Sequence, residues 1–456
     1  MQKLTALAAL CGSLTAHAGL LAADGGVDTS FSQDGNVSIA FDYGGTNADL
    51  HPSVVIDSLD RVIRFAEVAT DGSTGIGMSR HFSNGSIDTS FGVNGRKLLD
   101  LSALGGRWLS SPNALRAVDG KFYLLVRVEI AWGNTDFGLC RLFVSGNVDA
   151  SFSQDGCVTV PFIGGTLDYP VAMRFSPDDR IVLGGYKQAA GGTQLAFARL
   201  NLANATLDGS FGGAGGITFP LPGVDSSRLG DFAVQADSRI VFVGTALAAG
   251  RNNFDVLTGR LTAAGALDTS YFFPNGFRRI ALDLAGPSSA FSNDEATALH
   301  VDPRTRTLTV AGSLQTSATT KRGFITQIGD GFTNQNFGNA GYAIFAFAGD
   351  GGWFTDLAID GLGRIYAYGH ADTATGDYDL VLARLTSQGA ADTSFGGGQG
   401  LIYRNVGANR LNNLATQLSF MHGKPLLAGY SRLIAPDFDV NLTRVWVDLI
   451  FADGND

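Results

Sequence analysis

The sequence has few charged residues and little positive charge. Charged side chains make up 16% of the 456 residues, and 32 lysines and arginines face 42 aspartates and glutamates, for a formal net charge of −10. An acidic chain lacks the basic face that nucleic-acid binding needs, so no nucleic-acid partner is expected. The low share of charged residues argues against a coiled coil, and the 31 phenylalanines exclude a disordered chain.

Long apolar runs are missing except near the N-terminus. There, Lys3 is followed by an almost wholly apolar run over residues 4–14 and by Ala16-His17-Ala18. This order predicts a secretory signal peptide over residues 1–18, followed by a lead-in over 19–27, and thus an exported, periplasmic or secreted protein. A buried N-terminal helix is the alternative. No later run approaches the roughly 20 apolar residues of a membrane span, so none is expected.

Cysteine is scarce, and the spacing of metal or redox CxxC motifs is absent. Removal of residues 1–18 removes Cys11 and leaves Cys140 and Cys157. An even pair in an oxidising compartment can form a disulfide. The alternative is two separate buried thiols in different sheets.

An internal repeat dominates the rest of the chain. Units begin near residues 28, 88, 149, 208, 268, 334 and 392, each with a variant of Asp-Thr-Ser-Phe followed by a Gly, and fill residues 28–456. Within each unit, short alternating or apolar runs are separated by turns rich in Gly, Asn and Asp, which is typical of antiparallel strands. Seven units of about 60 residues predict an all-β, seven-bladed β-propeller with four antiparallel strands per blade. A β-solenoid or stacked sandwiches are the alternatives.

The boundary between blades stays open at this stage. Each unit can hold its own four strands, or the cut can fall inside a blade. In the second arrangement the strand at residues 36–41 completes the last sheet.

The repeated motifs resemble those of a known family. The strings DTSF…G, PDDRIVLGG (residues 177–185) and FARL (residues 197–200) are similar to the delta-60 repeat β-propeller family of exported bacterial proteins. The resemblance covers all seven units and implies the propeller fold. It implies no activity, because that family is largely uncharacterised. Units five and six depart most, with DPRTRTLTVAG at a hairpin and NQNF in place of DTSF.

The aromatic and acidic positions of the motif predict the joints between blades. The aromatic position is expected to pack there, with an aromatic ligand platform as the alternative (Phe31, Phe91, Phe152, Phe211, Tyr271, Phe337 and Phe395). The Asp can form an Asx-turn or pair with an Arg eight or nine residues earlier. Where the acid is Asn334, the base is also replaced, by Gln327, which favours pairing. The predicted ion pairs are Arg80–Asp88, Arg141–Asp149, Arg199–Asp208, Arg260–Asp268, Arg384–Asp392 and, closing the ring, Arg444–Asp28, with Asp453 as a competitor. Without a DxDxDG loop, no metal site is expected.

One variable position suggests a ligand site. It lies six residues beyond the position after each hairpin turn and holds Glu67, Arg127, Tyr186, Thr245, Ser313, His370 and Tyr430. At the mouth of the central channel, these side chains would suit a small polar ligand. The alternative is a solvated strand end on the outer rim.

Catalytic motifs are missing: the sequence has no HExxH, GxSxG or Walker loop, and its histidines are scattered. The catalytic residues stay unknown and no cofactor is expected. The favoured hypothesis is a monomeric, exported, non-catalytic binding or scaffold protein for a small polar ligand or a protein partner. The alternative is a secreted hydrolase or lyase acting on a carbohydrate or another polar substrate, and a third hypothesis is an adhesion-type surface protein.

Overall fold

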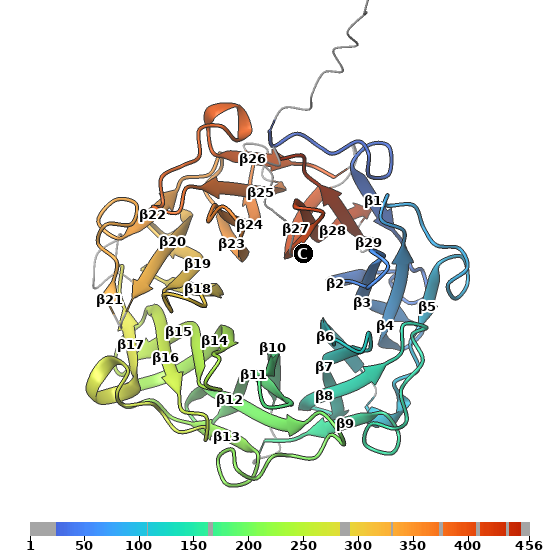
Figure 1. Cartoon of the computed structure of the whole chain (residues 1–456), viewed down its shortest axis with the longest axis horizontal. Helices are drawn as coiled ribbons and strands as arrows, with labels where there is room; N and C mark the ends of the chain where they lie inside the picture. The colour runs from blue at the N-terminus through green and yellow to red at the C-terminus, as the bar shows by residue number, and fades with distance from the viewer. Residues whose placement is uncertain are drawn as a thin grey trace, which may run out of the picture.

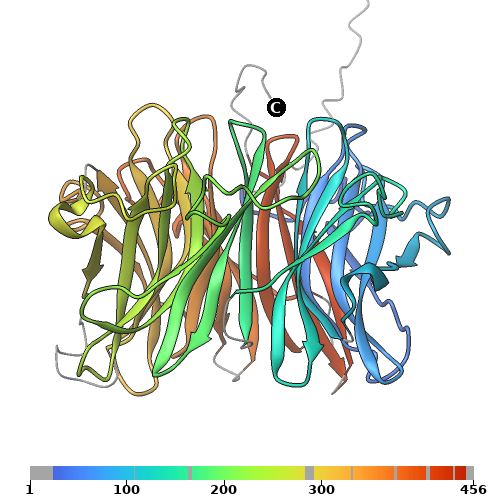
Figure 2. The same ribbon diagram turned by 90° about the horizontal axis from the view of Figure 1, so that it is seen from below.

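The protein is a closed seven-bladed β-propeller, as predicted (Figure 1). The computed structural model describes residues 24–106, 108–162, 167–282, 292–329, 332–373, 377–406, 411–434 and 437–447. The predicted signal peptide and Asp453 lie outside these residues. Each blade is an antiparallel sheet whose first strand borders the channel and whose last strand forms the rim. Figure 2 shows the strands running between the two flat faces of the disc.

The first four blades follow the chain from channel to rim. Blade one holds β2 (Asp49–Ile56), β3 (Val62–Thr70), β4 (Ser73–His81) and β5 (Arg96–Leu98). Blade two holds β6 (Trp108–Arg116), β7 (Phe122–Ala131), β8 (Asn134–Leu142) and β9 (Cys157–Val160). Blade three holds β10 (Asp168–Ser176), β11 (Arg180–Ala189), β12 (Gly192–Asn201) and β13 (Gly216–Phe219). Blade four holds β14 (Val224–Val234), β15 (Ile240–Ala248), β16 (Phe254–Leu261) and β17 (Phe277–Ile280).

The last three blades repeat this order with two variations. Blade five holds β18 (Asp294–Val301), β19 (Leu308–Gln315), β20 (Lys321–Gly329) and β22 (Tyr342–Phe345), with β21 (Phe332–Thr333) as an extra short strand. Blade six holds β23 (Gly352–Ile359), β24 (Ile365–Asp372), β25 (Tyr378–Leu385) and β26 (Leu401–Arg404). Blade seven holds β27 (Leu411–Met421), β28 (Lys424–Ile434), β29 (Asp437–Arg444) and, from the other end of the chain, β1 (Asn36–Ile39). The described helical segments are three single turns, η1 (Ser102–Leu104), η2 (Phe272–Gly276) and η3 (Gly396–Gly398), and none could cross a bilayer.

The ring is closed by a strand that the N-terminal part of the chain supplies. β1 pairs antiparallel with β29, from Asn36 opposite Thr443 to Ile39 opposite Val440. The sequence repeat and the blade are therefore out of phase by one strand, and the first strand of each repeat belongs to the preceding blade. Of the two arrangements that the sequence left open, the second is the one observed.

Each repeat needs its glycine after the Asp for a steric reason. Gly156, for example, has φ +88°, a conformation that side chains disfavour, and an added Cβ would lie 2.0 Å from Val148 Cγ1. The loop between the third strand and the rim strand can close tightly only with glycine here.

The Asp, Arg and aromatic positions form a single unit at six of the seven blade joints. The arginine Nε donates to the aspartate Oδ2 over 2.7–2.9 Å in Arg80–Asp88, Arg141–Asp149, Arg199–Asp208, Arg260–Asp268, Arg384–Asp392 and Arg444–Asp28. The Oδ1 of each aspartate accepts the backbone N–H and hydroxyl of the serine two residues later. Each carboxylate thus makes both the Asx-turn and the arginine contact.

The aromatic ring lies against the same arginine. The guanidinium carbon is 4.4–5.0 Å from the ring centroid at these six joints, so a cation–π contact adds to the burial of the ring. At the remaining joint, Asn334 Nδ2 donates to Gln327 Oε1 over 3.2 Å while Phe337 stays fully buried. A neutral pair therefore replaces the ionic one without loss of the joint.

Candidate functional site

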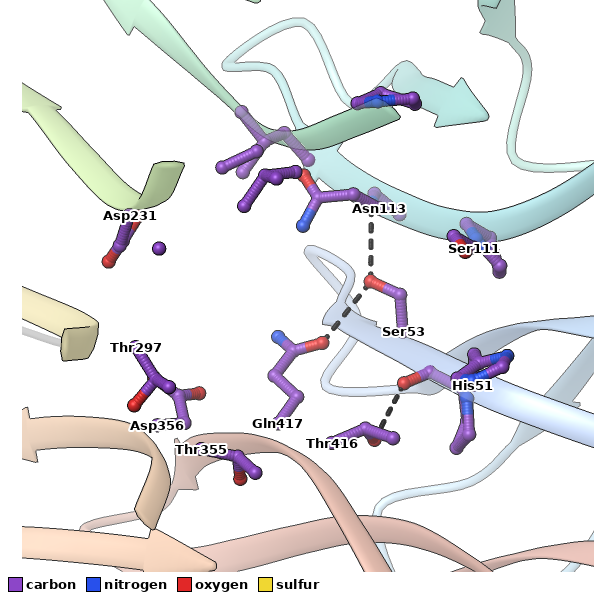
Figure 3. A pocket seen from close by; sticks show the side chains of 18 of the residues that line it. His51, Ser53, Ser111, Asn113, Asp231, Thr297, Thr355, Asp356, Thr416 and Gln417 are labelled. Carbon is purple, nitrogen blue, oxygen red and sulfur yellow. Dashed lines mark hydrogen bonds between the residues drawn. The ribbon is translucent and has the colours of Figure 1, made fainter. Parts of the chain in front are cut away.

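The central channel holds a cavity of about 500 Å³. Residues of the innermost strand of every blade line it, Arg174 among them. Figure 3 shows Ser53, Asn113, Asp231 and Asp356 around the cavity. This volume lies in the range of small-molecule pockets. All seven blades face this single space.

Bulges in the inner strands aim side chains into the cavity. The pairing of the first with the second strand skips a residue between Ala296 and Ala298, between Phe354 and Asp356, and between Ala415 and Gln417. The skipped residues, Thr297, Thr355 and Thr416, line the cavity. Because a bulge turns its extra residue out of the regular alternation, it can direct a polar group into the channel without disturbing the packed sheet.

The skipped threonines already donate to carbonyl groups. Thr297 Oγ1 donates to Phe354 O over 2.7 Å, and Thr416 Oγ1 donates to Pro52 O over 2.8 Å. Both acceptors belong to the next blade of the ring. Since a hydroxyl oxygen has two lone pairs, each can still accept a hydrogen bond from a ligand.

The residue after each bulge links one blade to the next. Asp231 Oδ2 accepts from Leu299 N over 3.1 Å, and Asp356 Oδ2 accepts from Leu418 N over 2.7 Å. In the same position, Gln417 Oε1 accepts from Val54 N over 2.7 Å, and Ser53 Oγ accepts from Ala114 N over 3.0 Å. These bonds fix the cavity wall before any ligand arrives.

The cavity carries one cation and two acids. Arg174 Nη2 donates to Asp231 Oδ1 over 2.6 Å. Burial raises the pKa of Asp231, and burial raises the pKa of Asp356 to about 7, with repulsion from Asp231 contributing in the same direction. The remaining oxygens of both acids accept backbone N–H bonds as well, from Phe232 and Leu357.

One polar atom of the wall has no partner among the described residues. Asn113 Oδ1 is buried and makes no hydrogen bond there. Figure 3 shows the Asn113 side chain projecting into the cavity. A buried amide oxygen without a partner is costly, and the Asn113 amide is one of the polar groups that line the cavity.

The seven side chains expected at the channel mouth do not line this cavity. They lie on the second strand of each blade and are buried or half-buried, so they are not a solvated rim either. The positions are Glu67, Arg127, Tyr186, Thr245, Ser313, His370 and Tyr430, on β3, β7, β11, β15, β19, β24 and β28 respectively. The pleat turns this position towards the neighbouring blade, while the first strand alone borders the channel.

Most of these side chains contact the next blade. The Arg127 guanidinium lies 4.3 Å from the Tyr169 ring, which stacks at 4.8 Å on Tyr186. Glu67 Oε2 accepts from Ser111 N over 3.3 Å, and Thr245 Oγ1 donates to Asp294 O over 3.3 Å. These side chains therefore connect neighbouring blades near the ends of the strands.

The remaining members follow the same pattern. His370 Nδ1 accepts from Ala415 N over 3.2 Å, and burial lowers the pKa of this imidazole to about 4, so the ring is neutral. Tyr430 lies 5.3 Å from the ring of His51, and burial raises its pKa to about 12. Ser313 is buried within β19.

Cys140 and Cys157 lie in one sheet. Cys140 of β8 is directly opposite Cys157 of β9, and a disulfide joins them. The alternative of separate sheets does not apply, because the third and fourth strands of a blade are neighbours. In the described part of the chain, no group of three or more His, Cys, Asp or Glu side chains is arranged to hold a metal ion.

The sequence contains a signal for the cavity wall at another repeat position. Four residues before the start of each hairpin turn, the inner strands carry Ser53, Asn113, Ala172, Asp231, Ala298, Asp356 and Gln417. Five of these seven residues are polar. Alignment of the repeats at this position, and not at the second strand, would have located the wall.

The comparisons with known proteins concern the propeller fold. Residues 176–211 and 363–395 match the model of a β-propeller domain of unknown function, DUF5122. A search of curated proteins found no match. The chain thus contains segments similar to a propeller repeat family whose function is not known.

Solved structures similar to this chain include polysaccharide lyase Uly1, with a TM-score of 0.53 and 12% identity over 87% of this chain and 90% of the lyase. A protein of unknown function from Dyadobacter fermentans has a TM-score of 0.45 and 11% identity over 91% and 98% of the two chains. The GH93 α-L-arabinofuranosidase of Fusarium graminearum has a TM-score of 0.44 and 12% identity over 77% and 97%. At such identities the likeness concerns the fold alone.

Proposed function

We propose that the protein is a non-catalytic binding protein whose central cavity takes a small polyhydroxylated ligand, such as a mono- or disaccharide. The observation that carries the proposal is the polar lining of one cavity by the Asn113 amide, the Arg174 guanidinium, threonine hydroxyls and two carboxyl groups. A sugar presents hydroxyl groups that both donate and accept. It therefore suits threonine hydroxyls, an amide, a guanidinium and carboxyl groups better than an apolar ligand does.

The hydrogen bonds of the two acids favour binding over catalysis. Each oxygen of Asp231 and Asp356 already accepts a backbone N–H, and Asp231 also accepts from Arg174. A catalytic carboxyl group must exchange a proton or attack a substrate, which these bonds oppose. A binding site gains from the same bonds, because they hold the wall in place in advance.

A carbohydrate hydrolase or lyase is the second candidate function. A specific observation favours it: Asp231 and Asp356 share one cavity, and the pKa of Asp356 is raised to about 7, where a carboxyl group can act as a general acid near neutral pH. Product formation separates the two functions.

We also propose that the mature protein acts outside the cytoplasm. The N-terminal pattern of residues 1–18 supports export, and the Cys140–Cys157 disulfide supports an oxidising compartment. Mass spectrometry of the protein recovered from its native host would show whether the chain begins after residue 18.

The experiment that tests the binding function is a titration of the mature chain with a panel of neutral mono- and disaccharides. Asn113→Leu and Arg174→Met should each weaken binding at least tenfold. Arg228→Met is the matched control, because Arg228 is exposed and does not line the cavity. Sugar binding of equal strength in all variants would exclude the cavity as the site.

A further inference from the structure

Two adjoining hollows lie away from the central channel, where blade four meets blade five. One is a cavity of about 340 Å³, to which three arginines contribute: Arg239, Arg260 and Arg306. The other, of about 540 Å³, is lined largely by aromatic rings, Phe272, Phe273 and Phe332 among them. Ser270 and Phe272 line both. Figure 1 shows the strands that frame the second hollow, β17 and β21, next to each other at the rim.

The first hollow has an excess of positive charge. No acidic residue lines it. The nearest paired carboxylate, Asp268, has its Oδ2 2.8 Å from Arg260 Nε and 3.7 Å from Arg239 Nε, so one acid serves two arginines. Asp237, at 3.8 Å from Arg239, is exposed, and a pair of this kind contributes little. Such an excess in a chain with a formal net charge of −10 favours an anionic ligand.

Several equivalent arginines bind the next blade through a terminal nitrogen atom, whereas Arg80, like Arg260, makes no such bond among the described residues. Arg141 Nη1 donates to Leu202 O, and Arg199 Nη1 donates to Ala263 O, in each case on the next blade. Within the described residues, Arg260 makes no such bond from its Nη atoms, and its guanidinium lies over Tyr271 at 4.4 Å. These nitrogen atoms are thus placed to donate to a ligand.

Arg306 occupies a turn position with a left-handed backbone conformation. It has φ +61°, and the equivalent turn residues of the other blades are Asp60, Gly120, Asp179, Ser238, Gly363 and Gly423, also with positive φ. The left-handed conformation disfavours a long side chain, and residues held in this way often serve a function. Here the substitution adds a guanidinium to the cavity.

The second hollow is also lined by residues that differ from the repeat pattern. Phe272-Phe273-Pro274 follows the aromatic position of unit five, where Gly92, Gly212 and Gly396 follow it in other units. Phe273 is 86% exposed and Phe332 is 70% exposed. The Arg278 guanidinium lies 5.9 Å from the ring of Phe332, and Asn275 also lines the hollow. Exposed aromatic faces beside amide and guanidinium donors are suited to the flat, partly apolar face of a sugar ring.

We propose that the two hollows together form one site, called the rim site below, which binds an acidic saccharide. The carboxylate or sulfate group of the saccharide lies among Arg239, Arg260 and Arg306. Its ring packs against Phe272 and Phe273. The site is separate from the central cavity, and neither the neutral ligand nor the cavity residues are needed for it. The saccharide assignment rests on the combination of an arginine-lined hollow with an aromatic-lined one. The arginines select the charge, and the adjoining aromatic wall selects a ring that bears it.

The test is calorimetric titration of the mature chain with tri-galacturonate, and with maltotriose as the neutral counterpart. Arg306→Ser installs the residue that blade four carries as Ser238 in this turn. Arg304→Ser removes the same charge at an exposed position two residues away that does not line the cavity. We expect tri-galacturonate to bind, Arg306→Ser to weaken it at least tenfold, Arg304→Ser to leave it nearly unchanged, and maltotriose not to bind at this site.

A second variant tests the aromatic wall. Phe273→Ala should weaken tri-galacturonate at least fivefold while leaving any binding of inorganic sulfate unchanged. Because Phe273 is exposed and Arg306→Ser relieves a disfavoured backbone conformation, both variants should melt at or above the temperature of the parent protein. Equal binding by Arg306→Ser and the parent would overturn the site. Sulfate or an acidic peptide binding as tightly as tri-galacturonate would overturn the saccharide assignment.

Discussion

Arg444 Nε donates to Asp28 Oδ2 over 2.7 Å and so joins two residues that are 416 positions apart. This contact sits beside the β1–β29 pairing and makes the last joint of the ring equivalent to the others. Lys424 Nζ lies 2.8 Å from the same oxygen, and these contacts and Ser30 hold the pKa of Asp28 down, at about 2, against the opposing effect of burial.

Arg444→Gln should lower the free energy of unfolding by about 2 kcal/mol, because it removes one of the two cations that contact a buried carboxylate and leaves only Lys424. The double variant Arg444→Gln with Asp28→Asn should recover a large part of this loss. It copies the neutral Gln327–Asn334 pair that the protein already uses. Urea unfolding of the three variants gives the coupling energy, and a double variant as unstable as the sum of the single ones would contradict the pairing.

Removal of β1 should open the ring. A chain beginning at residue 42 loses the rim strand of blade seven and exposes the edge of β29, whereas a chain beginning at residue 24 keeps both. The shorter chain should melt at a lower temperature and associate at micromolar concentration, as light scattering would show. Addition of a peptide of residues 24–41 should reverse both effects, and an unchanged shorter chain would argue against closure by this strand.

The disulfide should contribute substantially to stability. It closes a loop with a sequence separation of 17 between two buried cysteines. Replacement of Cys140 and Cys157 by alanine should lower the free energy of unfolding by about 3 kcal/mol. Reduction of the urea-unfolded parent protein before refolding should bring it to the level of the double variant. An oxidised parent protein no more stable than the double variant would contradict a stabilising bridge.

Stability should fall as the pH rises, and Asp49 should be one cause. This carboxyl is 1% exposed and accepts from Phe41 N, and burial raises its pKa to about 8. The folded protein then keeps a proton that the unfolded chain releases above its ordinary pKa of 3.8. The free energy of unfolding therefore declines between about pH 4 and pH 8.

Asp49→Asn should remove part of this decline. Blade seven already carries Asn413 in the equivalent position, where its Oδ1 accepts from Val406 N. The variant should be at least about 1 kcal/mol more stable than the parent at pH 8 and nearly equal at pH 4. The exposed Asp178→Asn serves as the control in urea unfolding at both pH values. A variant that loses stability equally at both would show that Asp49 is ionised in the fold.

The fold was readable from the sequence because each repeat carries its own steric and ionic signals. The glycine with positive φ and the Arg–Asp spacing recur in a fixed order, and they require the same loop in every unit. The one-strand offset was not decided by these signals, because a repeat has no marked beginning. It depends on pairing between residues 36–39 and 440–443, at opposite ends of the chain.

The candidate site was harder to predict for two physical reasons. A bulge in each inner strand shifts the alternation of side chains, so the strand pattern alone assigns Asp231 and Asp356 to a sheet face and not to the channel. The rim site combines departures within unit five with two arginines of unit four. It is visible only once the rim strand of blade four is known to lie beside blade five. Both depend on contacts between blades, which a single repeat does not contain.

The most direct test of the binding function is one calorimetric titration of the protein with a neutral disaccharide selected from the panel, followed by chromatography of the recovered sugar. The account predicts one ligand bound per chain, binding lost in Asn113→Leu and kept in Arg228→Met, and a disaccharide recovered intact. Cleaved or unsaturated products, or binding that Asn113→Leu leaves unchanged, would contradict it.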